Sequence, residues 1–280
     1  MRRLVLSMAL GAWAVSSSHA ADWSNTSLSY RTGSRFAEPF NGKDIRKDVV
    51  QFTHASGYTY GNNFVNLDIL LSDETDPSAK GASSGAQEFY VVYRNTLEWG
   101  KVSGKALGFG PVRDVGLTLG FDVNTKDDAG YNSKKRMLVA GPTLALDVTG
   151  LLNVGVYALW ESNAPYSTFT QVSTPRYRYD THPMLGAVWA LPLGATGLSF
   201  EGFANFIAAK GTNEFGRGTK PETNIDMQLM FDVGGLAGAK PKRFRAGVAY
   251  QYWRNKFGND SDTIAGATAS TPMVKAQYQF

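Results

Sequence analysis

Apolar and polar residues alternate with a period of two over several stretches of the chain. The clearest stretch is 223–232, where apolar side chains take every second position and polar ones the positions between. The same alternation covers 63–72, 113–124 and 243–254. It indicates β-strands with one face toward water. Each face is about ten residues long, as a tilted strand needs to cross a bilayer, whereas soluble strands usually have about five or six residues.

Counting every such segment predicts an all-β protein, a transmembrane antiparallel up-and-down β-barrel of about twelve strands. Segments 48–58, 136–147 and 180–191 alternate least cleanly, so about ten or about fourteen strands are alternatives. No run after residue 20 approaches the roughly 18 consecutive apolar residues of a membrane helix. The candidate strands are 26–35, 48–58, 63–72, 87–98, 113–124, 136–147, 151–161, 180–191, 198–209, 223–232, 243–254 and 271–280.

The connections between these strands alternate in length. Short turns on one side and long loops on the other are typical of outer-membrane barrels, in which the short side is periplasmic. The Gly-rich connection 99–112 is long although it falls on the short side. The connections on this side that are short are 59–62, 148–150 and 192–197. The long polar connections are 36–47, 73–86, 125–135, 162–179, 210–222 and 255–270.

Both ends of the chain resemble targeting signals. Residues 1–20 have an arginine pair, a short apolar run and a small-x-small ending, which predicts a cleaved signal peptide followed by one barrel domain over 21–280. The last strand alternates up to Tyr278 and Phe280 and resembles the terminal strand that the outer-membrane assembly machinery binds. We therefore expect the outer membrane of a Gram-negative bacterium, with its lipid and lipopolysaccharide around the barrel.

Composition excludes several kinds of site. The chain has no cysteine, and only His54 and His182 lie beyond the leader, so neither a thiolate metal site nor a histidine-rich centre is expected. We expect no cofactor and no metal. Without the leader the chain is close to neutral, which gives no support for nucleic-acid binding.

Closing the sheet turns every second side chain toward the lumen. Both signs of charge occur among the expected inward residues, which indicates either a wet path for a neutral polar solute or paired charges that plug the barrel. Tyr90 and Phe203 fall on this face, where a nucleobase would stack on them. Expected inward residues are Arg31, Arg35, Asn66, Asp68, Glu88, Arg94, Asp114, Asp122, Glu201, Asn205, Asp226, Gln228, Arg243, Arg245, Gln251, Lys275 and Gln277. Interfacial girdle positions are expected for Trp99, Trp160, Trp189 and Tyr278.

Short recognisable motifs lie at 29–31, 35–40, 54–58, 60–64, 67–73, 76–77, 85–88, 93–94, 109–111, 203–206, 252–253 and 278–280. Together they resemble the nucleoside-specific channel family of Gram-negative outer membranes, the Tsx and OmpK-like proteins. The resemblance implies a monomeric twelve-stranded barrel that passes nucleosides, with a surface that some phages and colicins use as a receptor. Positions carried over as solute contacts are Arg35, Phe36, Glu88, Arg94, Phe203, Asn205 and Trp253.

Two other functions are open. An outer-membrane enzyme needs a histidine beside a nucleophile, but the neighbours of His54 and His182 assemble no such site, so we expect no enzyme and place both at the girdle or rim. A surface receptor or adhesin is the second alternative, and the aromatic loop 162–179 either gates the mouth, binds a partner or is an exposed loop. The acidic turn 73–76 is interpreted as solvated charges.

Overall fold

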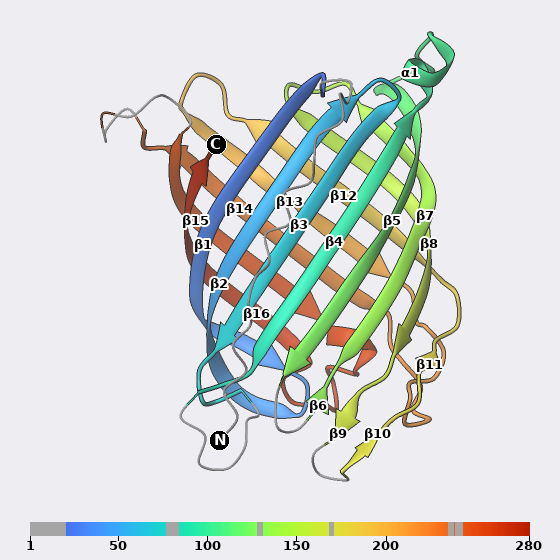
Figure 1. Cartoon of the computed structure of the whole chain (residues 1–280), viewed down its shortest axis with the longest axis vertical. Coiled ribbons are helices and arrows are strands. Elements are labelled where there is room, and N and C mark those ends of the chain that lie inside the picture. Colours follow the sequence, from blue (N-terminus) through green and yellow to red (C-terminus); the bar gives the residue numbers. More distant parts are fainter. Residues whose placement is uncertain (1–20, 77–83, 128–130, 168–170, 235–237, 239–242) are drawn as a thin grey trace, which may run out of the picture.

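The computed structural model describes residues 21–76, 84–127, 131–167, 171–234, 238 and 243–280. Within these residues, twelve antiparallel strands form a closed barrel (Figure 1), because β1 pairs with β16 and every other strand with its neighbour in sequence order. The twelve-stranded prediction is confirmed, including its three weakest segments. The signal peptide expected over 1–20 lies outside the described residues and stays a prediction. The barrel strands are β1 (Trp23–Glu38), β2 (Asn41–Tyr58), β3 (Gly61–Ser72), β4 (Gln87–Glu98), β5 (Val112–Asp127), β7 (Lys134–Leu146), β8 (Leu151–Asn163), β12 (His182–Pro192), β13 (Leu198–Ile207), β14 (Glu222–Asp232), β15 (Phe244–Arg254) and β16 (Thr268–Gln279).

The predicted long loop 36–47 is wrong. β1 and β2 continue through it and are joined only by Pro39 and Phe40, with Phe40 in the left-handed region at φ 70°. Register shifts lie between Gly33 and Phe36 and again between Phe36 and Glu38. These β-bulges break the two-residue period, so the alternation that marks a strand is lost from the sequence although the strand continues.

The two ends of the barrel differ. One end, termed the short-turn end, has the tight β2–β3, β7–β8 and β12–β13 turns, the C-terminus and the helix α1 (Trp99–Ser103). The other, termed the long-loop end, has small elements added to the barrel: β6 (Tyr131–Asn132), β9 (Tyr166–Ser167), β10 (Val172–Ser173), β11 (Tyr177–Arg178) and η1 (Lys256–Gly258). There the β1–β2 hairpin curves under the barrel, at the bottom of Figure 1.

Asp114 explains the length of the connection 99–112. Its carboxylate accepts hydrogen bonds from the backbone N–H of Gly100 at 2.8 Å and of Leu107 at 3.0 Å. It therefore ties both halves of this connection to β5. Asp114 lies at the short-turn end of the lumen and serves as an anchor for α1.

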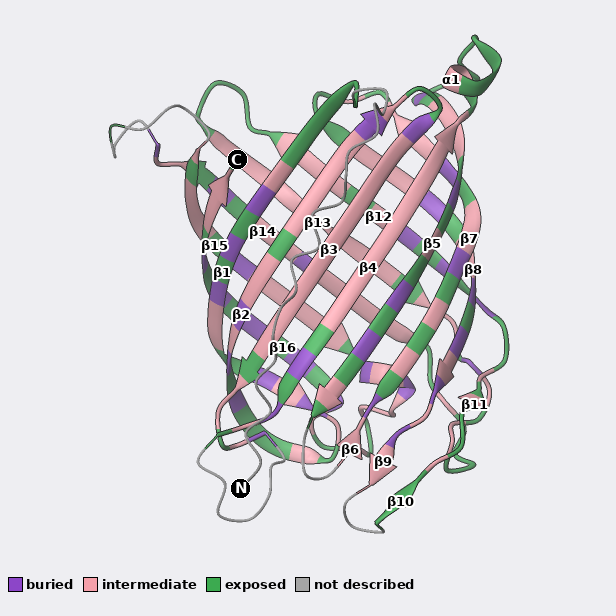
Figure 2. Cartoon of the chain, in the orientation of Figure 1, coloured by how far each residue is buried: buried purple, intermediate pink, exposed green. Residues whose placement is uncertain are grey.

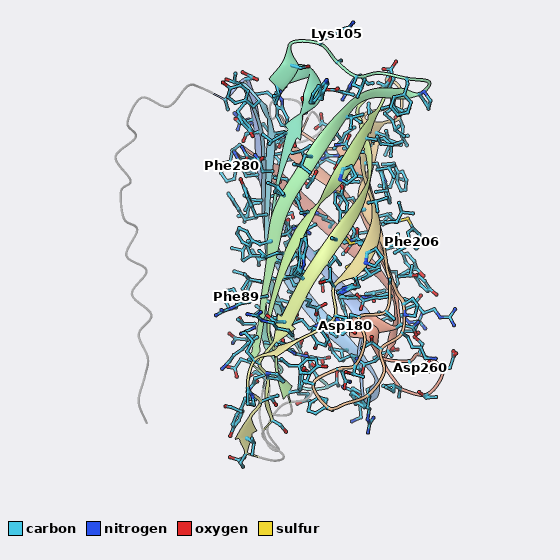
Figure 3. The ribbon with its side chains drawn as sticks, turned by 90° about the vertical axis from the view of Figure 1, so that its right-hand side faces the viewer. Phe89, Lys105, Asp180, Phe206, Asp260 and Phe280 are labelled. Carbon is cyan, nitrogen blue, oxygen red and sulfur yellow. The ribbon has the colours of Figure 1, made fainter. Side chains whose placement is uncertain are left out.

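The outer face of the barrel is apolar. Phe89, Phe206 and Phe280 point away from the barrel in Figure 3 and are 45%, 48% and 64% exposed. Buried residues recur at every second position of several strands in Figure 2, as two-faced strands require. Trp160 and Tyr278 project from the outer face, and Trp189 lies there against Phe200. None of the helices in the described part of the chain is long and apolar enough to cross a membrane.

Candidate functional site: the barrel lumen

The candidate site is the inner face of the barrel, which the strand register defines. Positions that pair across neighbouring strands share one face, and the buried odd positions of β1 set which face is inner. Arg243 lies one residue before β15, at the short-turn rim, and donates to the carbonyl of Gln279 at 3.1 Å. Predicted residues on the inner face are Arg31, Phe36, Asn66, Asp68, Glu88, Tyr90, Arg94, Asp114, Asp122, Glu201, Phe203, Asn205, Asp226, Gln228, Arg245, Gln251, Trp253, Lys275 and Gln277.

The inward position expected for Arg35 is wrong. Its side chain is 64% exposed and lies 3.9 Å from the outward carboxylate of Asp44. The cause is the bulge after Gly33. Before it the odd-numbered side chains of β1 point inward, and after it the even-numbered ones do. Phe36, the next residue, is therefore the one that enters the lumen, where it is 3% exposed.

Exposure of the inward side chains is uneven along the lumen and is lowest in the ion clusters at the long-loop end. Val188, near the short-turn end, is 40% exposed. Asp68, at mid-height, has a side chain that is 14% exposed, and Lys47, near the long-loop end, is 1% exposed. Water therefore reaches only part of the inner face, and inward side chains such as Thr143, 3% exposed, are buried toward the short-turn end as well.

A polar network crosses the wall at mid-height. Arg31 on β1 donates to Asp226 on β14 at 2.6 Å, and its second nitrogen lies 3.6 Å from Asp68 on β3. Lys275 donates to Gln51 at 2.7 Å and to the amide of Gln228 at 2.8 Å. Because each charge has a partner of opposite sign or an amide, the wall is polar without a strong net sign.

Two further ion pairs complete this polar zone. Arg245 binds Glu201, whose other oxygen accepts from Gln228 at 2.7 Å. On the opposite wall Arg94 binds Asp122, which also accepts from the hydroxyl of Tyr90 at 2.9 Å. The side chain of Arg94 is 21% exposed, so this pair borders the remaining water space.

One row of inner-wall groups has unused hydrogen-bonding capacity. Asn205, Asn224 and Trp253 are register neighbours on β13, β14 and β15. Among the described residues, Oδ1 of Asn224 and Nε1 of Trp253 are buried and have no hydrogen-bond partner. Leaving such a group unpaired costs about 1–3 kcal/mol. An acceptor and a donor thus stand side by side on the lumen wall, one register step from Phe203.

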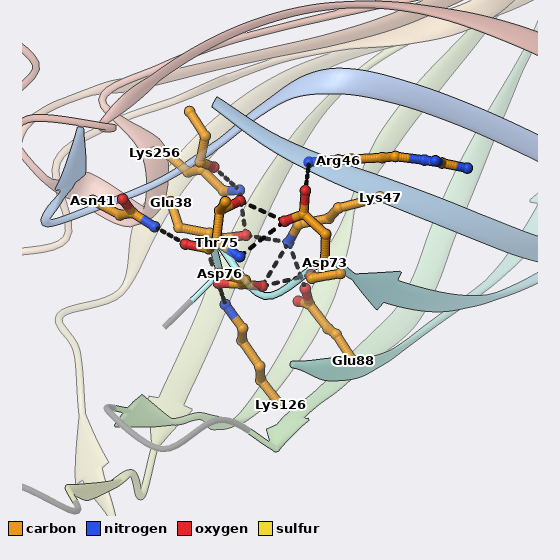
Figure 4. A network of polar contacts seen from close by, with 12 residues as sticks. Glu38, Asn41, Arg46, Lys47, Asp73, Thr75, Asp76, Glu88, Lys126 and Lys256 are labelled. Carbon is orange, nitrogen blue, oxygen red and sulfur yellow. Dashed lines mark hydrogen bonds and ion pairs between the residues drawn. The ribbon is translucent and has the colours of Figure 1, made fainter. Parts of the chain in front are cut away.

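An ion cluster closes the long-loop end beneath the β1–β2 hairpin (Figure 4). Glu38 lies 2.5 Å from Nζ of Lys47, 3.1 Å from that of Lys256 and 3.8 Å from that of Lys126. The carboxylate of Asp76 lies 2.9 Å from Lys126 and 3.5 Å from Lys47. These side chains are at most 8% exposed. Since β1 and β5 are four strands apart, the Glu38–Lys126 contact cuts across the lumen.

Lys256 joins this cluster from η1, outside the barrel strands. Burial lowers the pKa of Lys256, and the neighbouring Glu38 carboxylate opposes this effect. Its ammonium also donates to the carbonyl of Ala37 at 2.8 Å. Lys256 therefore holds the segment before β16 against the β1–β2 hairpin.

A second ion cluster occupies the opposite wall. Glu161 on β8 accepts two hydrogen bonds from Lys210, at 2.9 and 2.8 Å, and lies 3.7 Å from Lys135. Burial favours the neutral amine, but the carboxylates of Glu161, Glu222 and Glu214 together raise the pKa of Lys210. His182 lies 4.0 Å from Glu161 and is 2% exposed, so it points into the lumen wall and not to the rim as expected. His54 lies on the outer face, hydrogen-bonded to Thr26 at 2.7 Å.

Phe257 bridges the two sides of the lumen. It belongs to η1, between β15 and β16, yet Nζ of Lys135 on β7 lies 3.7 Å from its ring centroid. β7 stands on the far side of the barrel from β15 and β16. Its ring also packs on Trp253, with centroids 4.9 Å apart. Phe257 has φ 61°, an outlier for a bulky residue, so the local fold holds this ring in place at a conformational cost.

Two apolar patches lie on facing walls near the ion clusters. One joins Phe36, Ile45, Val49, Ala249 and Met273, with Leu70 against it. The other joins Val139, Leu159 and Met184, with Met137, Tyr157 and Ile207 against it. Apolar constrictions exclude water and ions more strongly than polar walls do. They therefore add to the closure at this end.

The loop 162–179 is tied to its neighbours. β11 pairs with β8, and β9 pairs with both β6 and β10. The Tyr179 hydroxyl donates to Glu214 at 2.6 Å, and that of Tyr177 donates to the carbonyl of Thr212 at 3.0 Å. The described residues of this loop extend the barrel wall beyond β8 (Figure 1).

The acidic turn 73–76 is built into the fold. Asp76 is fully buried in the ion cluster, so its interpretation as a solvated charge is wrong. Asp73 accepts hydrogen bonds from the backbone of Arg46 and Thr75. Within the described ranges no group of three or more His, Asp or Glu side chains is placed to hold a metal ion.

Most of the closing residues carry no signal in the alternation of the chain. Lys47 and Glu38 fell in a segment taken for a loop, and Lys210, Lys256 and Phe257 fall in connections, where alternation says nothing about direction. A signal did exist for Lys135 and Glu161, which continue the inward alternation of β7 and β8.

No family model and no curated protein matches the chain. Among solved structures, the chain is similar to the translocator domain of the autotransporter NalP from Neisseria meningitidis, with 12% identity, 94% of this chain and 90% of that chain covered, and a TM-score of 0.49. It is also similar to the KdgM porin, with 11% identity, 91% and 99% covered, and a TM-score of 0.41. A bacterial polysaccharide outer membrane secretin has 9% identity, 94% and 100% covered, and a TM-score of 0.41.

Proposed function

We propose that this protein is a channel of a Gram-negative outer membrane that lets small polar solutes diffuse through its lumen, with nucleosides as the solute class. A closed barrel with an apolar outer face satisfies all its backbone hydrogen bonds in lipid. Its short-turn end then faces the periplasm and its long-loop end the outside. In this arrangement the ion clusters narrow the outer mouth.

The lumen wall supports a neutral polar solute. Its mid-height charges are mutually paired, so the wall attracts neither cations nor anions strongly. The unpaired atoms of Asn224 and Trp253 offer an acceptor and a donor. Phe203 offers a ring face on the same wall. A nucleoside matches this set, because its base stacks and its polar edge and sugar form hydrogen bonds. The row at Asn224 and Trp253 carries the proposal.

Nucleosides are expected to block the ion current through purified protein in planar bilayers. Adenosine or thymidine at millimolar concentration enters the lumen and displaces the conducting water. Trp253→Phe keeps a ring but removes the Nε1 donor. Losing one neutral hydrogen bond costs about 1 kcal/mol, so the block weakens about fivefold.

Trp189→Phe is the matched control, because Nε1 of Trp189 is also without a partner among the described residues but lies on the outer face. It leaves the block unchanged. The nucleoside assignment is refuted if wild-type protein conducts but millimolar nucleoside has no effect on its current. If both substitutions weaken the block equally, Trp253 is not part of the nucleoside site.

A surface receptor for phage or colicin is the second candidate. The long-loop end favours it, because β9, β10 and β11 extend the structure outward and Val172 there is 56% exposed. Deleting 166–176 abolishes adsorption if this surface is the receptor and leaves nucleoside block intact. A wider conductance after the deletion assigns the loop to the channel mouth instead.

A further inference from the structure

Three arginines gather on the outer face at the long-loop end. Arg136 on β7 and Arg178 on β11 both pair in register with Ser162 of β8, one from each side. Arg176 donates to the Ser162 hydroxyl at 3.0 Å and to the carbonyl of Lys134 at 3.2 Å. Adjacent strands lie about 4.8 Å apart, so the Arg136 and Arg178 side chains start about 10 Å apart, and Arg176 reaches Ser162 between them. We call this group the arginine patch.

Among the described residues, no carboxylate forms an ion pair with the arginine patch. In the described part of the chain, none of Arg136, Arg176 and Arg178 forms a salt bridge, and all three are exposed. Partial burial and the nearby Arg136 guanidinium lower the pKa of Arg176. Cations placed together at a cost, without an acidic partner, indicate an anionic ligand from outside the chain.

Other outer arginines at this end show the contrast. Arg35 lies 3.9 Å from Asp44, Arg46 lies 3.6 Å from Asp48, and Arg254 lies 3.5 Å from Asp262. Each of these exposed guanidinium groups thus has a carboxylate of the same chain beside it. Within the described residues, the arginine patch differs from these three arginines in having no such carboxylate.

The arginine patch stands at the edge of the apolar belt. Leu138 and Trp160 pair with each other two residues along β7 and β8 from Arg136 and Ser162. Their side chains are 60% and 46% exposed on the outer face. Tryptophan prefers the level where acyl chains meet headgroups. One step farther out, at Arg136 and Ser162, the surface is at headgroup height.

We propose that the arginine patch binds a phosphate group of a glycolipid in the outer leaflet. The inference rests on the proposed outer-membrane orientation and adds a lipid site to it. Guanidinium groups bind phosphate oxygens in bidentate fashion, and the planar fork is less strongly hydrated than an ammonium. The neighbouring Trp160 and Leu138 then contact the acyl chains of the same lipid.

The test compares lipid binding by the purified barrel in detergent, measured by native mass spectrometry. The probes are lipid A with its phosphates and the same lipid after dephosphorylation. The variant Arg136→Gln/Arg176→Gln/Arg178→Gln removes the arginine patch. The control Arg35→Gln/Arg46→Gln/Arg254→Gln removes the same charge from the same end of the barrel.

Wild type and control are expected to retain the phosphorylated lipid, and the arginine-patch variant to bind it at least about tenfold more weakly, since a charge-assisted hydrogen bond contributes about 1.5–3 kcal/mol. Equal binding by all three proteins, or equal retention of the dephosphorylated lipid, overturns the proposal. So does inorganic phosphate that binds as strongly as the lipid. Nucleoside block in bilayers is unaffected by the variant, so the two proposals fail separately.

Discussion

Replacing Glu38 with alanine is expected to open the outer mouth of the barrel. Glu38 is the shared partner of Lys47, Lys126 and Lys256, whose ammonium groups lie within 3.8 Å of it. Its loss leaves an excess positive charge where side chains are at most 8% exposed. Removing one partner from a buried ion cluster costs about 3–5 kcal/mol. The lysines escape this cost by moving into water, which separates the β1–β2 hairpin from the segment before β16.

Single-channel conductance of Glu38→Ala should therefore rise several-fold, and thermal unfolding in detergent should shift to lower temperature. Glu74→Gln is the control, because Glu74 is an exposed acid at the same end, without a salt bridge within the described residues. It is expected to change neither quantity. The double variant Glu38→Ala/Lys256→Met removes one charge of each sign and recovers much of the lost stability. A folded Glu38→Ala barrel with wild-type conductance would show that this cluster does not close the lumen.

Replacing Phe257 with glycine is the second change with a large expected effect. The ring meets Lys135 from the opposite wall and covers Trp253. Glycine adopts a positive φ without strain, so the substitution removes the ring while keeping the backbone of η1. We expect conductance to rise several-fold with little loss of stability. Nucleosides should also block more strongly, because Trp253 becomes accessible from the outer mouth.

Phe40→Gly provides a close control. Phe40 also has a positive φ, 70°, and lies at the same end of the barrel, but its side chain is 69% exposed at the tip of the β1–β2 hairpin. This variant loses the same ring and relieves the same type of strain outside the lumen. Equal conductance of the Phe40 and Phe257 variants would show that the ring of Phe257 does not narrow the lumen.

The glycine before β16 shows how closely the closing segments approach each other. Gly266 has φ 75°, and a Cβ added to it would overlap the carbonyls of Glu38 and Asn41. The backbone N–H of Phe40 donates to the carbonyl of the adjacent Ala265 at 2.8 Å. The β1–β2 hairpin and the segment 255–267 thus meet directly as well as through Lys256, which is why both large effects are expected at one place.

The period of two along the chain was enough to predict the barrel. In 223–232 and 113–124 each residue's direction follows from its parity, because consecutive side chains of a strand point to opposite faces. The inward positions of Asp122, Asp226 and Arg31 follow from this local rule. The rule fails for Arg35, because the bulge after Gly33 reverses which positions point inward and leaves no sign in the apolar pattern of the sequence.

Closure of the lumen was decided by the tertiary structure alone. Glu38 and Lys126 are far apart in the chain, as are Lys135 and Phe257, and they meet only because the closed sheet brings opposite walls together. The arginine patch likewise needs β11 beside β8 to place Arg178 across from Arg136. Alternation determines which way a side chain points, whereas strand order, shear and bulges determine which partner it meets across the barrel.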